Sequence, residues 1–359
     1  MLRLLKTKIK LFKTSLAKLI LDKKINKPNR TLTIESIKSI IFFRTDDKIG
    51  DTVVSSFLYR EIKRKYPYIK IIVCCGKNNK EILKYNKNID ELYEVSGCLF
   101  KDIFVFKILK AQSISLAVDF SPFNPKFNHL LMLCIISAKF LIGFNKTSYK
   151  MYDLSINENF FSVHITDMYK YVLNLLKIEN PDLKYELPLP SKEEKVALEL
   201  ISNCKYKHKI VINPFSASKH RKLSINKLKE LINLIENSFD CCIFIVCKQK
   251  NKEKVAFLES DKTIIASFRS ILESAALIKY SDIIITPDTS IVHIASAFDK
   301  KTIALYCDYS DFYEKIDIIW GPNNPNAIQL SVDTKDGLFG NDVENIPNID
   351  IFNALKNFL

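Results

Sequence analysis

Short apolar runs alternate with amphipathic stretches along most of this 359-residue chain. In the first half, apolar runs predict β-strands at Ser39–Phe43, Ile69–Cys75, Glu91–Val95, Ile114–Val118 and Phe140–Gly143. The stretch between the first two runs, Asp51–Lys65, repeats apolar residues at helical spacing and is followed by Pro67, which favours a helix that ends there. Continuous apolar strands separated by helices are typical of a parallel sheet covered on both faces.

The same alternation restarts after a break. A predicted helix at Thr166–Ile178 is followed by Pro181, Pro188 and Pro190, which mark a domain boundary. The second half then predicts strands at Lys209–Asn213, Cys241–Cys247, Thr263–Ala266, Asp282–Thr286 and Thr302–Leu305, and helices at Ile225–Asn237, Ile271–Tyr280, Ile291–Phe298 and Ile349–Leu359. We therefore predict an α/β protein with two Rossmann-like parallel-sheet domains facing a central cleft, where ligands bind beyond the carboxyl ends of the strands.

The expected domains are residues 31–185 and 186–345, with a closing helix over 346–359. Residues 1–30 are expected to form a basic amphipathic helix and a linker. Residues 1–24 carry eight basic residues against one acid, Asp22, with apolar residues at helical spacing. Such a helix can lie on an anionic membrane surface, although an ordinary surface helix packed on its domain has the same pattern. A cleavable signal peptide and a spanning helix both fit poorly, since no A-x-A-like site follows and no apolar run reaches ~18 residues.

Charge and cysteine content narrow the class of protein. The chain has 54 Lys and Arg against 40 Asp and Glu, a net charge of +14. This excess fits an anionic partner, or equally a solvated lysine-rich surface. Nine Cys occur without a CxxC motif, an odd count that indicates reduced thiols and a cytoplasmic location. No metal site is expected from these spacings.

Asp51 is the first candidate for chemistry. It ends the stretch Arg44-Thr-Asp-Asp-Lys-Ile-Gly-Asp51, between a predicted strand and a predicted helix. A carboxylate at that point can accept the proton of a substrate hydroxyl, while the alternative is that Asp51 only caps the helix. Arg44, Lys48 and Gly50 are expected on the same side of the site, where the acceptor binds. Gly50 allows a close approach to the backbone.

Two later loops could hold an anion. The stretch Asn213–Lys222 follows a strand and gathers Lys219, Arg221 and Lys222, whose charges could neutralise a diphosphate leaving group, unless they are simply solvated. The stretch Thr286-Pro-Asp-Thr-Ser-Ile-Val-His293 places Asp288, Thr289 and Ser290 at a helix N-terminus, a natural anion site. His293 lies on the first turn of that helix, where a lone His is more often structural.

Together these loops resemble the heptosyltransferase family, glycosyltransferase family 9, which has the GT-B fold. Arg44–Asp51 is similar to that family's strand-to-helix element ending in Gly-Asp, and Asp288-Thr-Ser-x-x-His293 is similar to its Asp-Thr-Gly-x-x-His element. Val118-Asp-Phe, Ile142-Gly-Phe and Trp320-Gly-Pro match as well. The resemblance runs from about Ser39 to the C-terminus.

The resemblance implies an inverting, metal-independent glycosyltransferase without a cofactor. Asp51 would be the catalytic base, the donor ADP-heptose, and the acceptor a lipopolysaccharide core or a related glycan. The nucleotide-sugar site is then predicted to comprise Ser216, Lys219, Arg221, Lys222, Glu253, Asp288, Thr289, Ser290 and His293. Arg221 stands where the family usually has a Lys ahead of Trp-Pro, Leu223-Ser224 stands in place of that Trp-Pro, and Ser290 replaces the family's Gly. These departures bear on the donor's identity more than on the reaction.

Three other functions fit parts of the same pattern. A transferase with a hexose donor shares the predicted site, and a nucleotide-sugar epimerase shares the fold but needs no acceptor. A basic membrane-surface or nucleic-acid binding protein is the non-enzyme alternative. The basic residues are dispersed apart from the N-terminal segment and the Lys219–Lys222 loop, so no nucleic acid partner is expected. The predicted location is cytoplasmic, with peripheral contact to the inner face of the inner membrane.

Overall fold

The computed structural model of the chain describes residues 15–23, 32–121, 125–157, 163–307, 316–332 and 342–359. Its contacts divide the chain into two compact units. The first unit contains Met1–Thr52, Leu58–Asn159 and Met168–Asp182, and the second contains Val53–Phe57, Phe160–Asp167 and Leu183–Leu359. Each unit is built on its own parallel sheet, so the predicted α/β fold class is confirmed.

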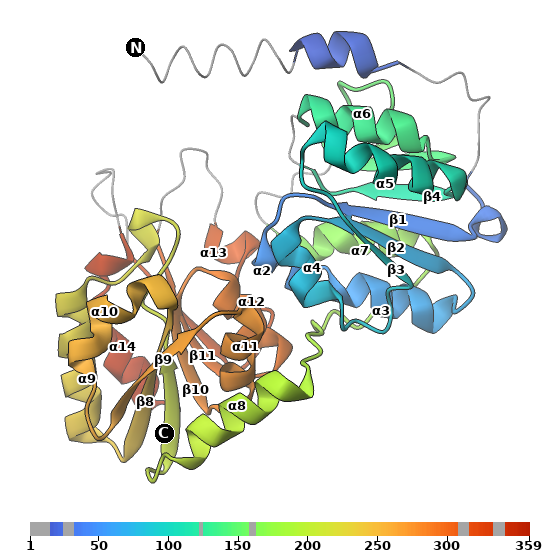
Figure 1. Cartoon of the computed structure of the whole chain (residues 1–359). Helices are drawn as coiled ribbons and strands as arrows, with labels where there is room; N and C mark the ends of the chain where they lie inside the picture. The colour runs from blue at the N-terminus through green and yellow to red at the C-terminus, as the bar shows by residue number, and fades with distance from the viewer. Residues whose placement is uncertain (1–14, 24–31, 122–124, 158–162, 308–315, 333–341) are drawn as a thin grey trace, which may run out of the picture. The chain divides into compact units, whose positions relative to one another are not determined.

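In the described residues, the sheet of the first unit has the order β3-β2-β1-β4-β5-β6 (Figure 1). All of its strand pairs are parallel. The predicted strands are confirmed to within two residues at each end, whereas the three-residue edge strand β6 was not predicted because so short a run leaves no periodic signal. The strands are β1 (Ser39–Arg44), β2 (Lys70–Cys75), β3 (Glu91–Glu94), β4 (Leu116–Asp119), β5 (Phe140–Phe144) and β6 (Leu154–Ile156).

Helices cover both faces of this sheet (Figure 1). On one face, α5 and α6 share a core with buried strand residues such as Phe43 and Cys74. On the other face, Phe42 of β1 meets Tyr59 of α3 edge to face at 5.2 Å between ring centroids, and α4 and α7 lie on the same side. The helices are α2 (Ile49–Val54), α3 (Ser56–Lys65), α4 (Lys77–Leu83), α5 (Leu99–Ala111), α6 (Phe127–Ile136) and α7 (Ile165–Leu175).

Three predicted helices have clearly different limits in the structure, and one of them, the closing helix predicted at Ile349–Leu359, spans Asn348–Lys356. The predicted helix Asp51–Lys65 is divided into α2 and α3 by a turn at Ser55. The helix predicted to reach Ile178 ends at Leu175, because Lys177 adopts a left-handed backbone with φ 53°. The Ile178 N–H then bonds the Leu173 carbonyl at 2.9 Å, which is the closing bond of a Schellman motif.

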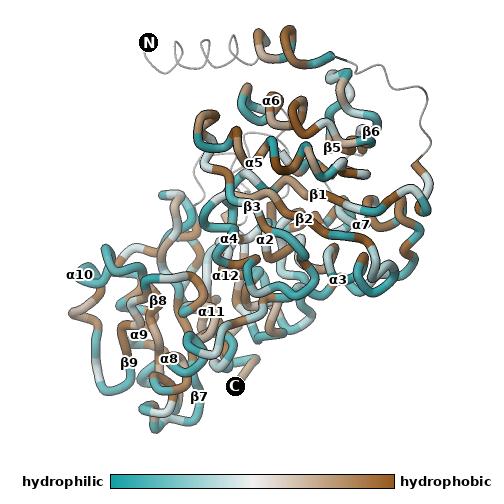
Figure 2. The backbone as a smooth tube through the Cα atoms, turned by 45° about the vertical axis from the view of Figure 1, so that its right-hand side comes forward, coloured by the Kyte–Doolittle hydropathy of each residue, from teal (hydrophilic) through white to brown (hydrophobic). Residues whose placement is uncertain are grey.

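The described part of the second unit has the sheet order β12-β11-β10-β7-β8-β9. The predicted strands are again confirmed, and the edge strand β12 was not predicted. The edge strands β12 and β9 of this sheet pair in parallel with their neighbours. Most of the strand residues are hydrophobic and are brown in Figure 2. The strands are β7 (His208–Ile212), β8 (Cys241–Lys248), β9 (Thr263–Phe268), β10 (Ile283–Pro287), β11 (Lys301–Tyr306) and β12 (Ala327–Ser331).

Side-chain caps explain why the helices of the second unit begin where the sequence predicts. Ser224 accepts from the Lys227 N–H at the start of α9, and Ser270 forms a reciprocal capping box with Glu273 at the start of α11. The helix α8 was not predicted. Among the described residues, no helix is both long enough and apolar enough to cross a membrane. The helices are α8 (Ser191–Ser202), α9 (Ile225–Ser238), α10 (Lys252–Val255), α11 (Ile271–Tyr280), α12 (Ser290–Ala297), α13 (Ile316–Ile319) and α14 (Asn348–Lys356).

Candidate functional site

The strand order places a natural binding point in the first unit between β1 and β4. The chain leaves β1 towards β2 on one side and leaves β4 towards β5 on the other, so the two loops diverge at the carboxyl ends of these strands. Ligands in sheets of this kind bind at such a switch point. The β1–α2 loop, residues 45–48, begins here and leads into Asp51.

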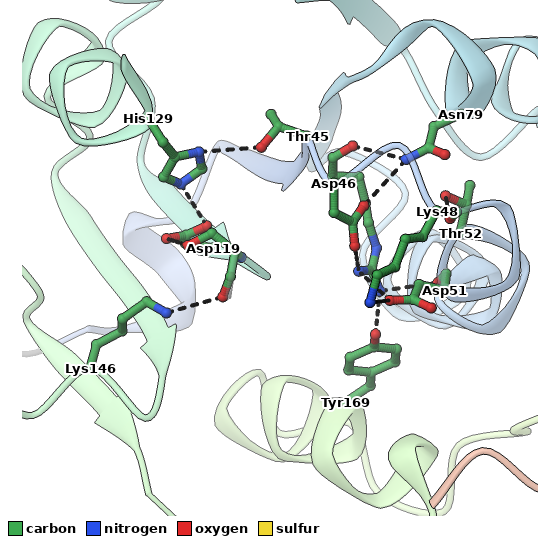
Figure 3. A network of polar contacts seen from close by, with 12 residues as sticks. Thr45, Asp46, Lys48, Asp51, Thr52, Asn79, Asp119, His129, Lys146 and Tyr169 are labelled. Atoms are coloured by element: carbon green, nitrogen blue, oxygen red, sulfur yellow. Dashed lines mark hydrogen bonds and ion pairs between the residues drawn. The ribbon is translucent and has the colours of Figure 1, made fainter. Parts of the chain in front are cut away.

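Asp51 lies inside the first turn of α2 rather than at its cap. The helix begins at Ile49, two residues earlier than predicted, so the capping alternative is wrong. Its carboxylate lies 3.9 Å from the Arg44 guanidinium and 3.8 Å from the ammonium of the exposed Lys48 (Figure 3). Burial raises the pKa of Asp51, and the two cations oppose that rise without cancelling it. A carboxylate with a raised pKa is a stronger proton acceptor than an ordinary aspartate.

Arg44 holds the β1–α2 loop and the start of α2 in place through buried contacts. Its guanidinium is buried, donates to the main-chain carbonyl of Asp51 at 3.0 Å and pairs with Asp46 at 3.4 Å. It also donates to the Tyr169 hydroxyl and lies 4.5 Å from the ring centroid of Phe120, a cation–π contact. Because the group is fully enclosed by the protein, its part in the predicted acceptor side is to hold Asp51 rather than to touch an acceptor.

A second polar network lies at the end of β4. Asp119 is fully buried and accepts from the Tyr152 hydroxyl at 2.5 Å, while its other oxygen lies 2.9 Å from Nε2 of His129 on α6. Nδ1 of His129 lies 3.2 Å from the Thr45 hydroxyl, on the loop that carries Asp51 (Figure 3). Burial alone would raise the pKa of Asp119, but His129 and then Lys146 outweigh it and hold that pKa well below its usual range.

This network was not predicted, although one signal for it was present. Asp119 follows directly on an apolar strand, which is where functional side chains of parallel sheets occur. With Nε2 of His129 donating to Asp119, Nδ1 bonds the Thr45 hydroxyl, as an acceptor in the neutral ring and as a donor in the imidazolium. The pair therefore ties the Asp51 loop to the neighbouring strand across the switch point.

The second unit repeats the arrangement between β7 and β10, whose following strands also lie on opposite sides. Asn213, directly after β7, donates to the Thr286 hydroxyl at 3.0 Å and to the Thr289 hydroxyl at 3.2 Å. Thr289 is the N-cap of α12 and accepts from the Ile291 N–H. The side chain of Asn213 thus joins both predicted anion-binding loops.

Arg221 and Asp288 form an ion pair across these loops. The guanidinium of Arg221 lies 2.6 Å from the Asp288 carboxylate, which is nearly buried, while Arg221 itself stays about one-third exposed. The short helical turn Lys219–Arg221 that presents it is capped by Ser218. Asp288 therefore orients a partly accessible guanidinium, the group best suited to bidentate phosphate contact.

His293, a predicted residue of the nucleotide-sugar site, is buried and uncharged. It is buried in α12 between Tyr185 and Trp320, whose ring centroids lie 6.2 Å and 6.1 Å away. Burial, helped by His164, lowers the pKa of His293 to about 3. The imidazole is therefore neutral at neutral pH and can contribute only a hydrogen bond. Its Nδ1 has no hydrogen-bond partner among the described residues.

The remaining predicted residues lie on the same two loops, with the exception of Glu253. Ser216 accepts from the Ser218 N–H at 3.2 Å, and Ser290 begins α12. Lys219 and Lys222 are exposed on either side of Arg221, while Glu253 is exposed on α10, which follows the carboxyl end of β8. The structure therefore groups most of these residues at one switch point of the second unit.

The chain is similar to known proteins of one family over most of its length. A model of glycosyltransferase family 9 (heptosyltransferase) matches residues 130–337, more than half of the chain. A putative lipopolysaccharide heptosyltransferase 4 of Escherichia coli K12 is 28% identical over 315 residues, covering 85% of each chain.

Two solved structures share the fold. A family 9 glycosyltransferase from Veillonella parvula superposes with a TM-score of 0.74 at 16% identity, covering 89% of this chain and 97% of that one. The E. coli ADP-heptose lipopolysaccharide heptosyltransferase II gives 0.70 at 16% identity, covering 90% and 98%. The predicted two-domain fold of this class is thereby confirmed.

Proposed function

The chain belongs to glycosyltransferase family 9, the heptosyltransferase family, and is therefore a glycosyltransferase; from that premise we propose that it transfers heptose from ADP-heptose to a lipopolysaccharide core or a related glycan. The relatives support the two substrates, since one is named a lipopolysaccharide heptosyltransferase and another an ADP-heptose heptosyltransferase. The observation that supports the catalytic part is the position of Asp51, a carboxylate in the first turn of α2 whose pKa is raised by burial.

In the proposed reaction, Asp51 takes the proton of an acceptor hydroxyl. The hydroxyl oxygen attacks the anomeric carbon of the donor from the side opposite the leaving group. The bond to the diphosphate oxygen breaks, and ADP leaves with the bonding electron pair, so the configuration at that carbon inverts. We propose that no metal ion or cofactor takes part, and that protein cations balance the charge of the leaving diphosphate.

The proposed donor site is the switch point of the second unit. Arg221, held by Asp288, supplies a guanidinium for the diphosphate, and the N-terminus of α12 at Thr289 and Ser290 offers backbone amides. Lys219 and Lys222 add positive charge nearby, while His293 contributes a neutral imidazole. Ser216 follows β7 and Glu253 follows β8, so both lie beyond the carboxyl ends of these neighbouring strands.

A panel of nucleotide diphosphates tests the donor assignment. ADP should raise the melting temperature more than UDP, GDP or CDP at equal concentration, because stabilisation grows with ligand concentration over its dissociation constant. ADP-heptose should then be consumed only when a lipopolysaccharide-type acceptor is added. A preference for UDP or GDP would favour a hexose donor, and consumption without acceptor would favour an epimerase; either result contradicts the proposal.

We further propose a cytoplasmic enzyme that contacts an anionic membrane surface through residues 1–24, with no nucleic acid partner. The basic residues of positions 1–13 supply the charge. Replacing Arg3, Lys6, Lys8, Lys10 and Lys13 by Gln should weaken binding to phosphatidylglycerol vesicles. Unchanged binding would contradict this role of the segment.

A further inference from the structure

The outward face of α5 carries exposed apolar side chains that do not contribute to the hydrophobic core. Phe100, Phe104 and Ile108 recur at helical spacing and are 87%, 69% and 50% exposed. The opposite face of the helix already supplies the core, through Phe106 and Leu109. Single exposed apolar residues are ordinary, but a row of them marks an interaction site.

The N-terminal helical segment, residues 15–21, extends this face. Ala17 is buried in the same core as α5 and α6, and the Leu21 carbonyl lies 3.3 Å from the thiol of Cys134 on α6. Leu16, Leu19 and Ile20 nevertheless remain exposed. α5, α6 and this segment lie on the same side of the first sheet (Figure 1), and hydrophobic residues run along all three in Figure 2.

Lysines accompany the apolar row. Lys101, Lys107 and Lys110 are exposed on α5, whereas its one acid, Asp102, is buried and accepts from the Ser96 N–H and hydroxyl at 2.9 Å each. Helix α6 has no Lys, Arg, Asp or Glu, and it is preceded by the exposed Lys126. The face therefore presents aromatic and aliphatic side chains flanked by exposed lysines.

We propose that this face docks the enzyme on an anionic phospholipid bilayer. Phe100, Phe104 and Ile108 enter the boundary between headgroups and acyl chains, and the neighbouring lysines contact lipid phosphates. A second copy of the chain fits less well, because a symmetric interface would bring the same three lysines of both copies together. The inference rests on the membrane contact proposed above and adds a folded surface to it: its own evidence is the exposed apolar row and the lysines of α5, which are independent of the donor, the acceptor and residues 1–13.

Vesicle co-sedimentation tests the proposal directly. The full chain should bind vesicles of phosphatidylglycerol and phosphatidylethanolamine, and bind phosphatidylcholine vesicles weakly. The double variant Phe100→Ser/Phe104→Ser should lose on the order of tenfold or more in partitioning, because two large apolar groups no longer enter the membrane. Lys101→Gln/Lys107→Gln should lose a similar factor on anionic vesicles only, and that loss should vanish at high salt.

Phe257→Ser is the matched control, since Phe257 is 63% exposed and belongs to the second unit, whereas the proposed face belongs to the first. It should partition like the parent chain. All variants should keep the parent's stabilisation by ADP and its transfer to a water-soluble acceptor, which separates this surface from the proposed reaction. Equal partitioning of the parent and the Phe100→Ser/Phe104→Ser variant would overturn the proposal. So would light scattering that shows a dimer abolished by the same variant, without any vesicle binding.

Discussion

At the scale of single residues, the candidate site depends on how the protein treats two charged groups. Asp51 has its charged form disfavoured by burial, while Arg44 and Lys48 limit the effect. Arg221 is held by Asp288 but stays partly accessible. Asp51 is therefore suited to accept a proton and Arg221 to bind an anion. Substitution of Asp51 should reduce the transfer rate, and substitution of Arg221 should reduce the affinity for ADP.

Asp51→Asn should fold normally and transfer sugar about 10²–10⁴-fold more slowly, the usual value of a positioned proton acceptor. Its ADP affinity should match the parent's. The parent's rate should rise with pH through an Asp51 pKa above the ordinary aspartate value, because only the carboxylate accepts the proton. Rate–pH profiles and calorimetric ADP titrations measure both; a variant with the parent's turnover would exclude the base assignment.

Linkage gives a stability signature for the same residue. The raised pKa means that the folded state holds this proton more tightly than the unfolded state does. The resulting stabilisation is present below the ordinary aspartate pKa and is lost as the pH rises through the raised pKa. Asp51→Asn should therefore be at least as stable as the parent at pH 7 by urea denaturation, and a marked loss of stability would contradict a net unfavourable charge.

Arg221→Ala should weaken ADP binding roughly 10- to 100-fold, in line with about 1.5–3 kcal/mol for a hydrogen bond to a charged group. Arg221→Lys should recover part of that loss, since the charge returns without the planar fork. Isothermal titration with ADP and with adenosine separates the phosphate contribution, because adenosine affinity should not change. Equal ADP affinity in all three proteins would remove Arg221 from the site.

At the scale of elements, the β1–α2 loop is fixed by contacts from distant segments. Asp47, at φ 58°, accepts from the Asn78 N–H at 2.8 Å at the start of α4. Gly76 precedes that helix, and a Cβ there would lie 2.5 Å from an Asp47 carboxylate oxygen. The backbone of Gly76 therefore has to approach the loop that leads into Asp51.

Gly76→Ala should displace this loop, cost about 1–3 kcal/mol of stability through overpacking, and slow transfer. Asp47→Ala should be harmful alone, yet combined with Gly76→Ala it should cost less than the two changes added, because the clashing group is gone. Gly97→Ala is the control: Gly97 has a positive φ of 75° and open space around it, so stability should fall while the rate is kept. Additive losses in the double variant would contradict the close approach.

At the scale of the whole molecule, all nine cysteines are free thiols in a folded α/β protein. Cys98 is exposed, whereas Cys74, Cys75 and four others are buried within the two cores. Burial raises the pKa of Cys75 to about 12 and that of Cys241 to about 11, so neither is a thiolate at neutral pH. Thiol reactivity consequently reports how far the molecule has opened.

Iodoacetamide at pH 8 should modify Cys98 first, then the half-buried Cys134 and Cys204, and the buried thiols only as fast as the fold opens. Mass spectrometry of a time course gives the order, and urea should bring all nine to a common rate. A saturating nucleotide that binds the native state should slow the buried thiols of the second unit without affecting Cys98. Early labelling of Cys74 or Cys75 would contradict the packing of the first core.

The sequence alone determined the fold class and most element positions, because hydrophobic periodicity is local and each apolar run is long enough to read. It also predicted that Asp51, Arg221 and Asp288 lie in segments that follow strands, and the structure has them in such segments, after β1, β7 and β10. The edge strands β6 and β12 escaped detection, because β6 has only three residues and β12 mixes apolar residues with Gln329 and Ser331 instead of forming a continuous apolar run.

Only the tertiary structure decided which of these groups meet. Thr45 and His129 are 84 residues apart, and Arg44 reaches Tyr169 across 125 residues. Those pairings follow from the strand order, which sets β1 beside β4 and β7 beside β10, and local periodicity does not encode that order. The burial that raises the pKa of Asp51 and leaves His293 neutral has the same origin, because desolvation is a property of the assembled core rather than of neighbours in sequence.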